Sequence, residues 1–119
     1  MTTPGAAARR KGHEAERKAV RWLRDHGYPD ARTTRSALGH DGFDQTRIGD
    51  LDAIPGIAID VKAANRLEIP DWLRQVRAEA GPDRLPLLWV WRPGLADPGD
   101  WWAIARWADL HDTIGDCLA

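Results

Sequence analysis

The sequence predicts an α/β protein in which a central β-sheet is flanked by helices. Three observations support this prediction. Residues 11–26 repeat their apolar side chains with a helical period, residues 49–62 hold two short apolar runs around a Pro-Gly turn, and residues 85–91 form a continuous apolar run. The chain has 119 residues, of which 43% are apolar and 29% charged, as expected for one globular domain.

The first half of the chain is expected to form one helix and three strands. Residues 1–9 are small and polar, which predicts a disordered or frayed start, so the domain itself would span residues 10–119. The first helix would run over residues 11–26, because Gly27 can end it. A strand, a loop and a two-stranded hairpin would follow, at residues 31–36, 37–46 and 49–62.

The second half is expected to contain a helix, two strands and a final helix. Pro70 suits the first turn of a helix, and Gly81 followed by Pro82 would end it. Several tryptophans lie in this half, and large aromatic side chains there are expected to fill the core or a subunit interface rather than to stack on bases. The predicted order is therefore α-β-β-β-α-β-β-α, with the last four elements at residues 70–80, 85–91, 101–106 and 107–118.

Composition argues against several classes of protein. No apolar run approaches the roughly 20 residues that span a bilayer, and residues 1–8 lack the apolar core of a signal peptide. A single cysteine, Cys117, excludes an internal disulfide and a cysteine-based zinc cluster. We therefore expect a cytoplasmic protein with no membrane partner.

Charge is unevenly distributed along the chain. Residues 1–35 hold nine basic and four acidic side chains, whereas residues 36–119 hold eight basic and fourteen acidic ones. A basic segment can bind phosphate groups, so Arg10 and Lys11 are candidate contacts to nucleic acid. Alternatively, these are ordinary solvent-facing side chains of a basic helix.

The predicted hairpin carries an unusual set of charged residues. Alternate side chains of a strand share a face, so Asp60 and Lys62 lie together at the end of an otherwise apolar strand. They could form a surface ion pair worth under about 1 kcal/mol. The functional interpretation is a metal site in which Asp50 and Asp60 hold a hard divalent cation and Lys62 lies beside a reacting phosphate.

The register of this hairpin decides whether the two aspartates meet. A plain two-residue turn at Pro55 and Gly56 pairs Asp50 with Val61, and Asp50 then points away from Asp60. If both aspartates bind the metal, a three-residue loop or a β-bulge must offset the register. Asp52 shares the strand face of Asp50 and is the alternative ligand.

The first helix contains two glutamates with different expected environments. Glu16 projects between Ala19 and Val20, inside the apolar stripe, whereas Glu14 lies on the basic, solvent-facing side. Burying a carboxylate is costly unless it is paired or binds a metal. Glu16 is therefore a further candidate for the site.

These residues resemble the PD-(D/E)XK nuclease superfamily. Asp50 stands at the position of the family's Asp, Gly49 replaces its Pro, and Asp60-Val61-Lys62 stands at its (Asp/Glu)-x-Lys motif. With Glu16 and the pair Arg35-Ser36, the blocks over residues 10–62 are similar to those of archaeal and bacteriophage Holliday-junction resolvases. The resemblance implies a restriction-endonuclease-like core, that is, a mixed central β-sheet flanked by helices.

The resemblance also implies a function for the predicted site. It implies a homodimeric, metal-dependent endonuclease, with residues 10–119 as a single nuclease domain, that resolves four-way DNA junctions by phosphodiester hydrolysis. Mg²⁺, or Mn²⁺ in its place, would be held by Asp50, Asp60, Glu16 and the backbone carbonyl of Val61, and Lys62 would stabilise developing negative charge. Arg35 and Ser36 would contact phosphates. Gln75 would lie near the metal.

Three alternatives stay open. The same nuclease could act on another branched or duplex DNA in repair, in restriction or on flaps. The chain could instead be a DNA-binding module without catalysis, in which the acidic cluster is only structural. Gln75 is equally well explained as an ordinary amide on a helix surface.

Overall fold

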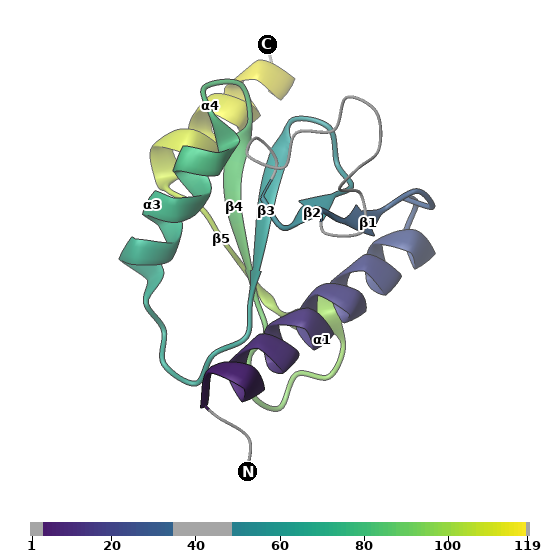
Figure 1. Cartoon of the computed structure of the whole chain (residues 1–119). Helices are drawn as coiled ribbons and strands as arrows, with labels where there is room; N and C mark the ends of the chain where they lie inside the picture. Colours follow the sequence, from purple (N-terminus) through teal and green to yellow (C-terminus); the bar gives the residue numbers. More distant parts are fainter. Residues whose placement is uncertain (1–3, 35–48, 119) are drawn as a thin grey trace.

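A three-stranded mixed β-sheet forms the centre of the fold (Figure 1). The structure is a computed structural model that describes residues 4–34 and 49–118. In the central sheet, β3 (Ile57–Lys62) runs parallel to β4 (Leu85–Val90), and β5 (Trp102–Ile104) runs antiparallel to β4. A separate two-stranded antiparallel ladder joins β1 (Arg32–Thr33) to β2 (Leu51–Asp52).

Helices cover both faces of the central sheet (Figure 1). On one face, α1 (Pro4–Asp25) packs its buried alanines and Leu23 against Ile59 and Val61 of β3. On the other face, α3 (Ile69–Ala80) packs Val76 and Ala80 against Ala58, Leu88 and Val90, and α4 (Trp107–Leu118) joins α3 through an ion pair between Arg77 and Asp109. The described residues also contain the short 3₁₀ turn η2 (Pro98–Asp100).

The predicted order of helices and strands is confirmed for the described elements, and so is an α/β fold with a mixed sheet between helices. The apolar stripe predicted for α1 is also confirmed, because Ala15, Ala19, Val20 and Leu23 are buried. The predicted start of this helix is wrong. The helix begins at Pro4, so residues 4–9 are helical rather than frayed, as suits a proline in the first turn followed by three strong helix formers, Ala6 to Ala8.

The hairpin predicted for residues 49–62 does not form a continuous ladder. Pro55 and Gly56 do make the expected tight turn, in which the N–H of Ile57 donates to the carbonyl of Ile54 at 3.2 Å. However, β2 pairs with β1 instead of β3, with Arg32 opposite Asp52. An isolated parallel bridge to β3 forms two residues before β2 begins, between Gly49 and Ile59.

The tryptophans divide into an inner cluster and an outer group. Trp101 is buried, and it stacks on Trp91 with a centroid distance of 5.1 Å and lies edge-on to Trp89 at 6.1 Å. Trp102 and Trp107 are instead exposed and do not fill the core. No helix in the described part of the chain is both long and apolar enough to cross a membrane.

Candidate active site

Asp50 and Asp60 meet at the free edge of β3. The N–H of Asp50 donates to the carbonyl of Ile59 at 2.8 Å and to Oδ1 of Asp60 at 3.1 Å. In return, the N–H of Val61 donates to Oδ2 of Asp50 at 2.9 Å. Each carboxylate is therefore fixed against the backbone of the other aspartate's segment. The offset that this convergence requires is provided by the bridge at Gly49 and not by the hairpin turn.

Gly49 makes the close approach of the two segments possible. Its φ is +74°, in the left-handed region that other residues seldom adopt. A Cβ atom added to Gly49 would lie 2.7 Å from both Oδ1 of Asp60 and the carbonyl oxygen of Ile59. A side chain at this position would push the loop that carries Asp50 away from β3.

The same hydrogen bonds indicate where the Val61 carbonyl points. Within a strand, the N–H and C=O of one residue point to the same side. Because the Val61 N–H is directed at Asp50, the Val61 carbonyl also points to the edge that carries Asp50. This orientation agrees with the expectation that the Val61 carbonyl is available as a metal ligand.

Burial and neighbouring carboxylates raise the pKa of both aspartates. Burial is the largest cause for Asp50, followed by the negative charges of Asp60 and Glu16, and together they raise its pKa to about 7. Burial also comes first for Asp60, which is 1% exposed, followed by the contact of its carboxyl with that of Glu79 and the charge of Glu79, and its pKa likewise rises to about 7. The positive charge of Lys62 opposes both shifts.

Glu16 occupies the buried position that the helical pattern predicts. It is 8% exposed, and its charge acts on Asp50 from the α1 side of the sheet. Glu14 instead lies at the surface and pairs with Lys18 at 3.9 Å. The different environments of the two glutamates are confirmed, whereas a catalytic role for Glu16 stays a prediction.

Lys62 and Gln75 contact each other across β3 and α3. Nζ of Lys62 donates to Oε1 of Gln75 at 3.3 Å and lies 5.8 Å from the centre of the Trp72 ring. Gln75 therefore lies beside the predicted site, as expected, and its contact is to the lysine. Trp72 offers the ammonium an aromatic face that favours a cation.

Sequence reasoning missed Glu79. This residue lies one helical turn after Gln75 on α3, and its carboxyl contacts that of Asp60. The spacing held a usable signal, because residues four apart on a helix lie on the same face and Gln75 was already a candidate. Glu79 went unnoticed because a charged residue near the end of a helix is usually solvated.

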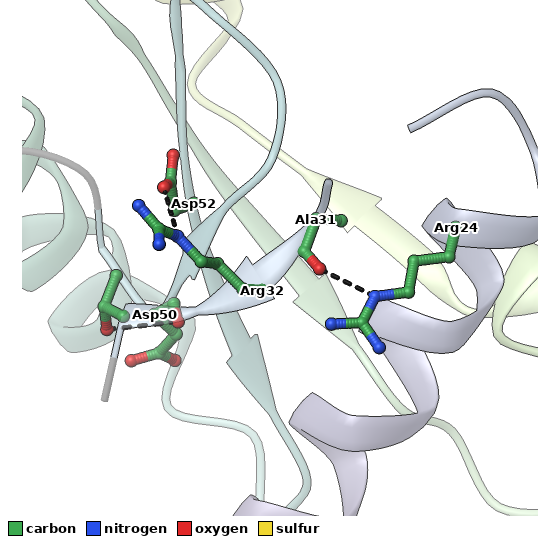
Figure 2. A network of polar contacts seen from close by, with 6 residues as sticks. Arg24, Ala31, Arg32, Asp50 and Asp52 are labelled. Carbon is green, nitrogen blue, oxygen red and sulfur yellow. Dashed lines mark hydrogen bonds and ion pairs between the residues drawn. The ribbon is translucent and has the colours of Figure 1, made fainter. Parts of the chain in front are cut away.

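The alternative ligand Asp52 is engaged elsewhere (Figure 2). Its Oδ2 accepts a hydrogen bond from Nε of Arg32 at 2.9 Å, in a partly exposed ion pair between β1 and β2. Figure 2 shows the Asp50 carboxylate pointing away from this pair. The Asp50 backbone is held by Thr34, whose N–H and hydroxyl both donate to the Asp50 carbonyl, at 2.9 and 3.2 Å.

The predicted DNA contacts are only partly described. Arg10 is exposed on α1, and Nζ of Lys11 donates to Oδ1 of Asn65 at 3.3 Å. Arg35, Ser36 and the predicted loop at 37–46 lie outside the described residues. A groove of about 340 Å³ between α1 and β1 was not predicted. It is called the basic groove here because three arginines outnumber one aspartate in its lining, which consists of Arg17, Val20, Arg21, Arg24, Asp25 and Thr33.

The carboxylates fit a divalent cation with few protein ligands. Within residues 4–34 and 49–118, no three or more Asp, Glu, His or Cys side chains are placed to hold a metal ion together. Mg²⁺, however, keeps several waters and usually takes only one or two carboxylates. Asp50 and Asp60 provide two, and the buried Oδ2 of Asp60 has no hydrogen-bond partner in the described structure.

No family model, curated protein or solved structure matches this chain. The resemblance to the nuclease superfamily therefore rests on Glu16, Asp50, Asp60, Lys62 and their spacing. The structure adds that these four residues lie around the edge of one strand, since the charges of Asp60, Glu16 and Lys62 all act on Asp50.

Proposed function

We propose that the protein is a metal-dependent DNA endonuclease that hydrolyses phosphodiester bonds. The observation that carries this proposal is the reciprocal fixing of Asp50 and Asp60, with Lys62 on the same strand. Two carboxylates held together while buried repel each other unless a proton or a cation lies nearby. A protein that needed them only for stability would do better with apolar side chains at these positions.

Each residue of the site would have a separate role in hydrolysis. Asp50, Asp60 and the Val61 carbonyl would hold Mg²⁺, which when bound supplies Lewis acidity and lowers the pKa of a coordinated water. The Lys62 ammonium would stabilise negative charge on the phosphate oxygens, with its position maintained by Gln75 and Trp72. Glu16 would keep the negative potential at Asp50 high and so favour a cation there.

DNA is the substrate class that the basic groove favours. Arg17 and Arg21 are exposed, and the guanidinium of Arg24 is fixed by a hydrogen bond from its Nε to the Ala31 carbonyl at 2.8 Å. Thr33 lines the groove and is followed in the chain by Thr34, which holds the Asp50 backbone. A phosphate backbone bound in the groove would therefore lead toward the acidic site.

A four-way junction is the specific substrate that we propose, and a homodimer is the form that would cut it. Both come from the resemblance to junction resolvases, and the exposed Trp102, Trp107 and Ile114 offer an apolar surface for a second copy. Two active sites related by symmetry would cut two strands of the junction symmetrically.

A substrate panel tests the proposal. The purified chain is incubated with Mg²⁺ or Mn²⁺ and labelled four-way junctions, flaps or linear duplexes, and cleavage is compared with reactions in EDTA. We expect metal-dependent cleavage with a preference for the four-way junction. Equal or better cleavage of flaps or duplexes would indicate that the protein is an endonuclease with another substrate. Binding of DNA without cleavage under any of these conditions would refute catalysis and favour the binding module.

A further inference from the structure

One row of side chains on α3 lies along one row of side chains on β3. Gln75 and Glu79 are four residues apart, about 6 Å along a helix axis, while Lys62 and Asp60 are two residues apart, about 6.6 Å along a strand. Gln75 contacts Lys62, and Glu79 contacts Asp60. The two rows therefore have matching spacings and run in opposite directions. The Asp60–Glu79 contact follows from how the helix packs on the strand.

The Asp60–Glu79 contact leaves two oxygens without partners. Asp60 is 1% exposed, and while its Oδ1 accepts from the Asp50 N–H, its Oδ2 has no hydrogen-bond partner. Oε2 of Glu79 is likewise buried and without a partner. Two carboxylates cannot donate to each other, so the contact is favourable only with a proton or a cation between them.

A cation explains this arrangement better than a structural contact does. Lys62 is the basic residue beside the pair, but its ammonium is directed at Gln75 and Trp72. Carboxylate oxygens are the preferred ligands of Mg²⁺ and Mn²⁺, and unpartnered oxygens of this kind can bind without first losing a hydrogen bond.

We propose that Glu79 is a metal ligand that, with Asp60, binds a divalent cation between the two carboxylates. The reaction that this cation would serve rests on the proposed function. The binding of the cation itself can be tested separately.

Isothermal titration calorimetry at pH 8 provides the test, with Mg²⁺ and Mn²⁺ added to the unaltered chain and to Glu79→Gln. We expect Glu79→Gln to weaken affinity for the cation by about tenfold or more. Glu14→Gln, which removes an exposed carboxylate from α1, is the matched control and should leave the affinity unchanged. Thermal unfolding in EDTA should show that Glu79→Gln is folded, since the variant loses a repulsion rather than a favourable contact.

The outcomes separate this inference from the proposed function. Equal or tighter cation binding by Glu79→Gln would overturn the inference, as would absence of binding by the unaltered chain. If Glu79→Gln weakens binding but the unaltered chain cleaves no DNA, then the inference holds and the proposed function fails. If the unaltered chain cleaves DNA and Glu79→Gln binds metal normally, then the function holds and the inference fails.

Discussion

Lys62 is the cationic side chain that follows Asp60 on the same face of β3. In the proposed mechanism it would contribute charge beside the reacting phosphate, so Lys62→Ala should reduce cleavage by at least about a hundredfold. Folding should persist, since Lys62 is only half-buried and its hydrogen bond to Gln75 is exposed. Single-turnover cleavage and circular dichroism of the variant check both expectations. A variant that cuts at the rate of the unaltered chain would remove Lys62 from the mechanism.

Glu16 and Glu14 provide a matched pair of substitutions on one helix. Glu16→Gln keeps the size of the side chain but removes the charge that acts on Asp50, so it should lower activity and raise the Mg²⁺ concentration required for half-maximal cleavage. Glu14→Gln should do neither, because that carboxylate is exposed and pairs only with Lys18. A Mg²⁺ titration of cleavage compares the two. If Glu14→Gln is the impaired variant, the assignment of Glu16 is wrong.

The raised pKa of Asp60 predicts a dependence of stability on pH. The folded protein holds this pKa at about 7, above the usual 3.8, so between these values the folded state binds a proton more tightly than the unfolded state does. In EDTA, stability should therefore fall as pH rises from about 4 through 7 and then level off. The contribution of Asp60 to this fall should be at most about 4 kcal/mol, because each unit of difference in pKa corresponds to about 1.4 kcal/mol.

Thermal unfolding in EDTA at pH 5.5 and pH 8 measures this effect. In Asp60→Asn, the difference between the unfolding temperatures at the two pH values should be smaller, because the substitution removes the group whose ionisation is disfavoured. Glu14→Gln is again the control and should retain the pH dependence of the unaltered chain. A midpoint that rises between pH 5.5 and pH 8 in the unaltered chain would contradict the prediction.

At the scale of elements, α1 packs on the core and, in the proposed function, also binds DNA. Its inner face packs on the sheet, and its outer face supplies the arginines of the basic groove. Arg17→Glu and Arg21→Glu should each weaken DNA binding, and each lost phosphate contact should reduce the slope of log affinity against log salt by about 0.9. Arg74→Glu, on α3 and already paired with Asp71, should have little effect on the slope. An unchanged slope in Arg17→Glu and Arg21→Glu would place the DNA elsewhere.

Elements with a regular period were predictable from the sequence, and their pairing was not. The buried stripes of α1 and α3 and the apolar run of β4 each reflect burial along a single element. The pairing of β2 with β1 instead of β3 depends on residues twenty positions apart, Arg32 and Asp52, whose ion pair has no local signature. The tight turn at Pro55 and Gly56 suggested a hairpin, but a turn shows only that the chain reverses.

The candidate site was predictable where its residues follow one local pattern. Asp60 and Lys62 were found by strand alternation, and the burial of Glu16 was found by helical phase. The register that joins Asp50 to Asp60 was not, because it depends on the positive φ of Gly49 and a bridge formed outside any ladder. Glu79 was missed because its contact with Asp60 depends on how α3 packs against β3.

At the scale of the whole molecule, the surface of β5 and α4 exposes large apolar side chains. Trp107 is 73% exposed and Trp102 is 49% exposed, and β5 lies at the edge of the central sheet. If this surface joins two copies, Trp107→Ser should weaken the affinity of the dimer by about tenfold or more, since buried tryptophans are frequent centres of binding energy. Light scattering across micromolar concentrations measures the change, with Arg74→Glu as the control. A monomeric unaltered chain would refute the homodimer.

The backbone at Gly49 restricts which sequences can retain this fold. Five described glycines have positive φ, but at the other four, Gly27, Gly56, Gly81 and Gly94, an added Cβ would meet nothing within 4 Å. At Gly27, Gly56 and Gly94 the positive φ is the obstacle to a side chain, and Gly81, with φ of 67° and ψ of −165°, lies in a region that essentially only glycine adopts. Position 49 combines an unfavourable φ with a collision against Ile59 and Asp60. Proline fits least of all, because its ring fixes φ near −65° and the backbone here is at +74°. A search pattern that demands proline before the first aspartate would therefore pass over this chain, and in a saturation library position 49 should be the least variable glycine of the five.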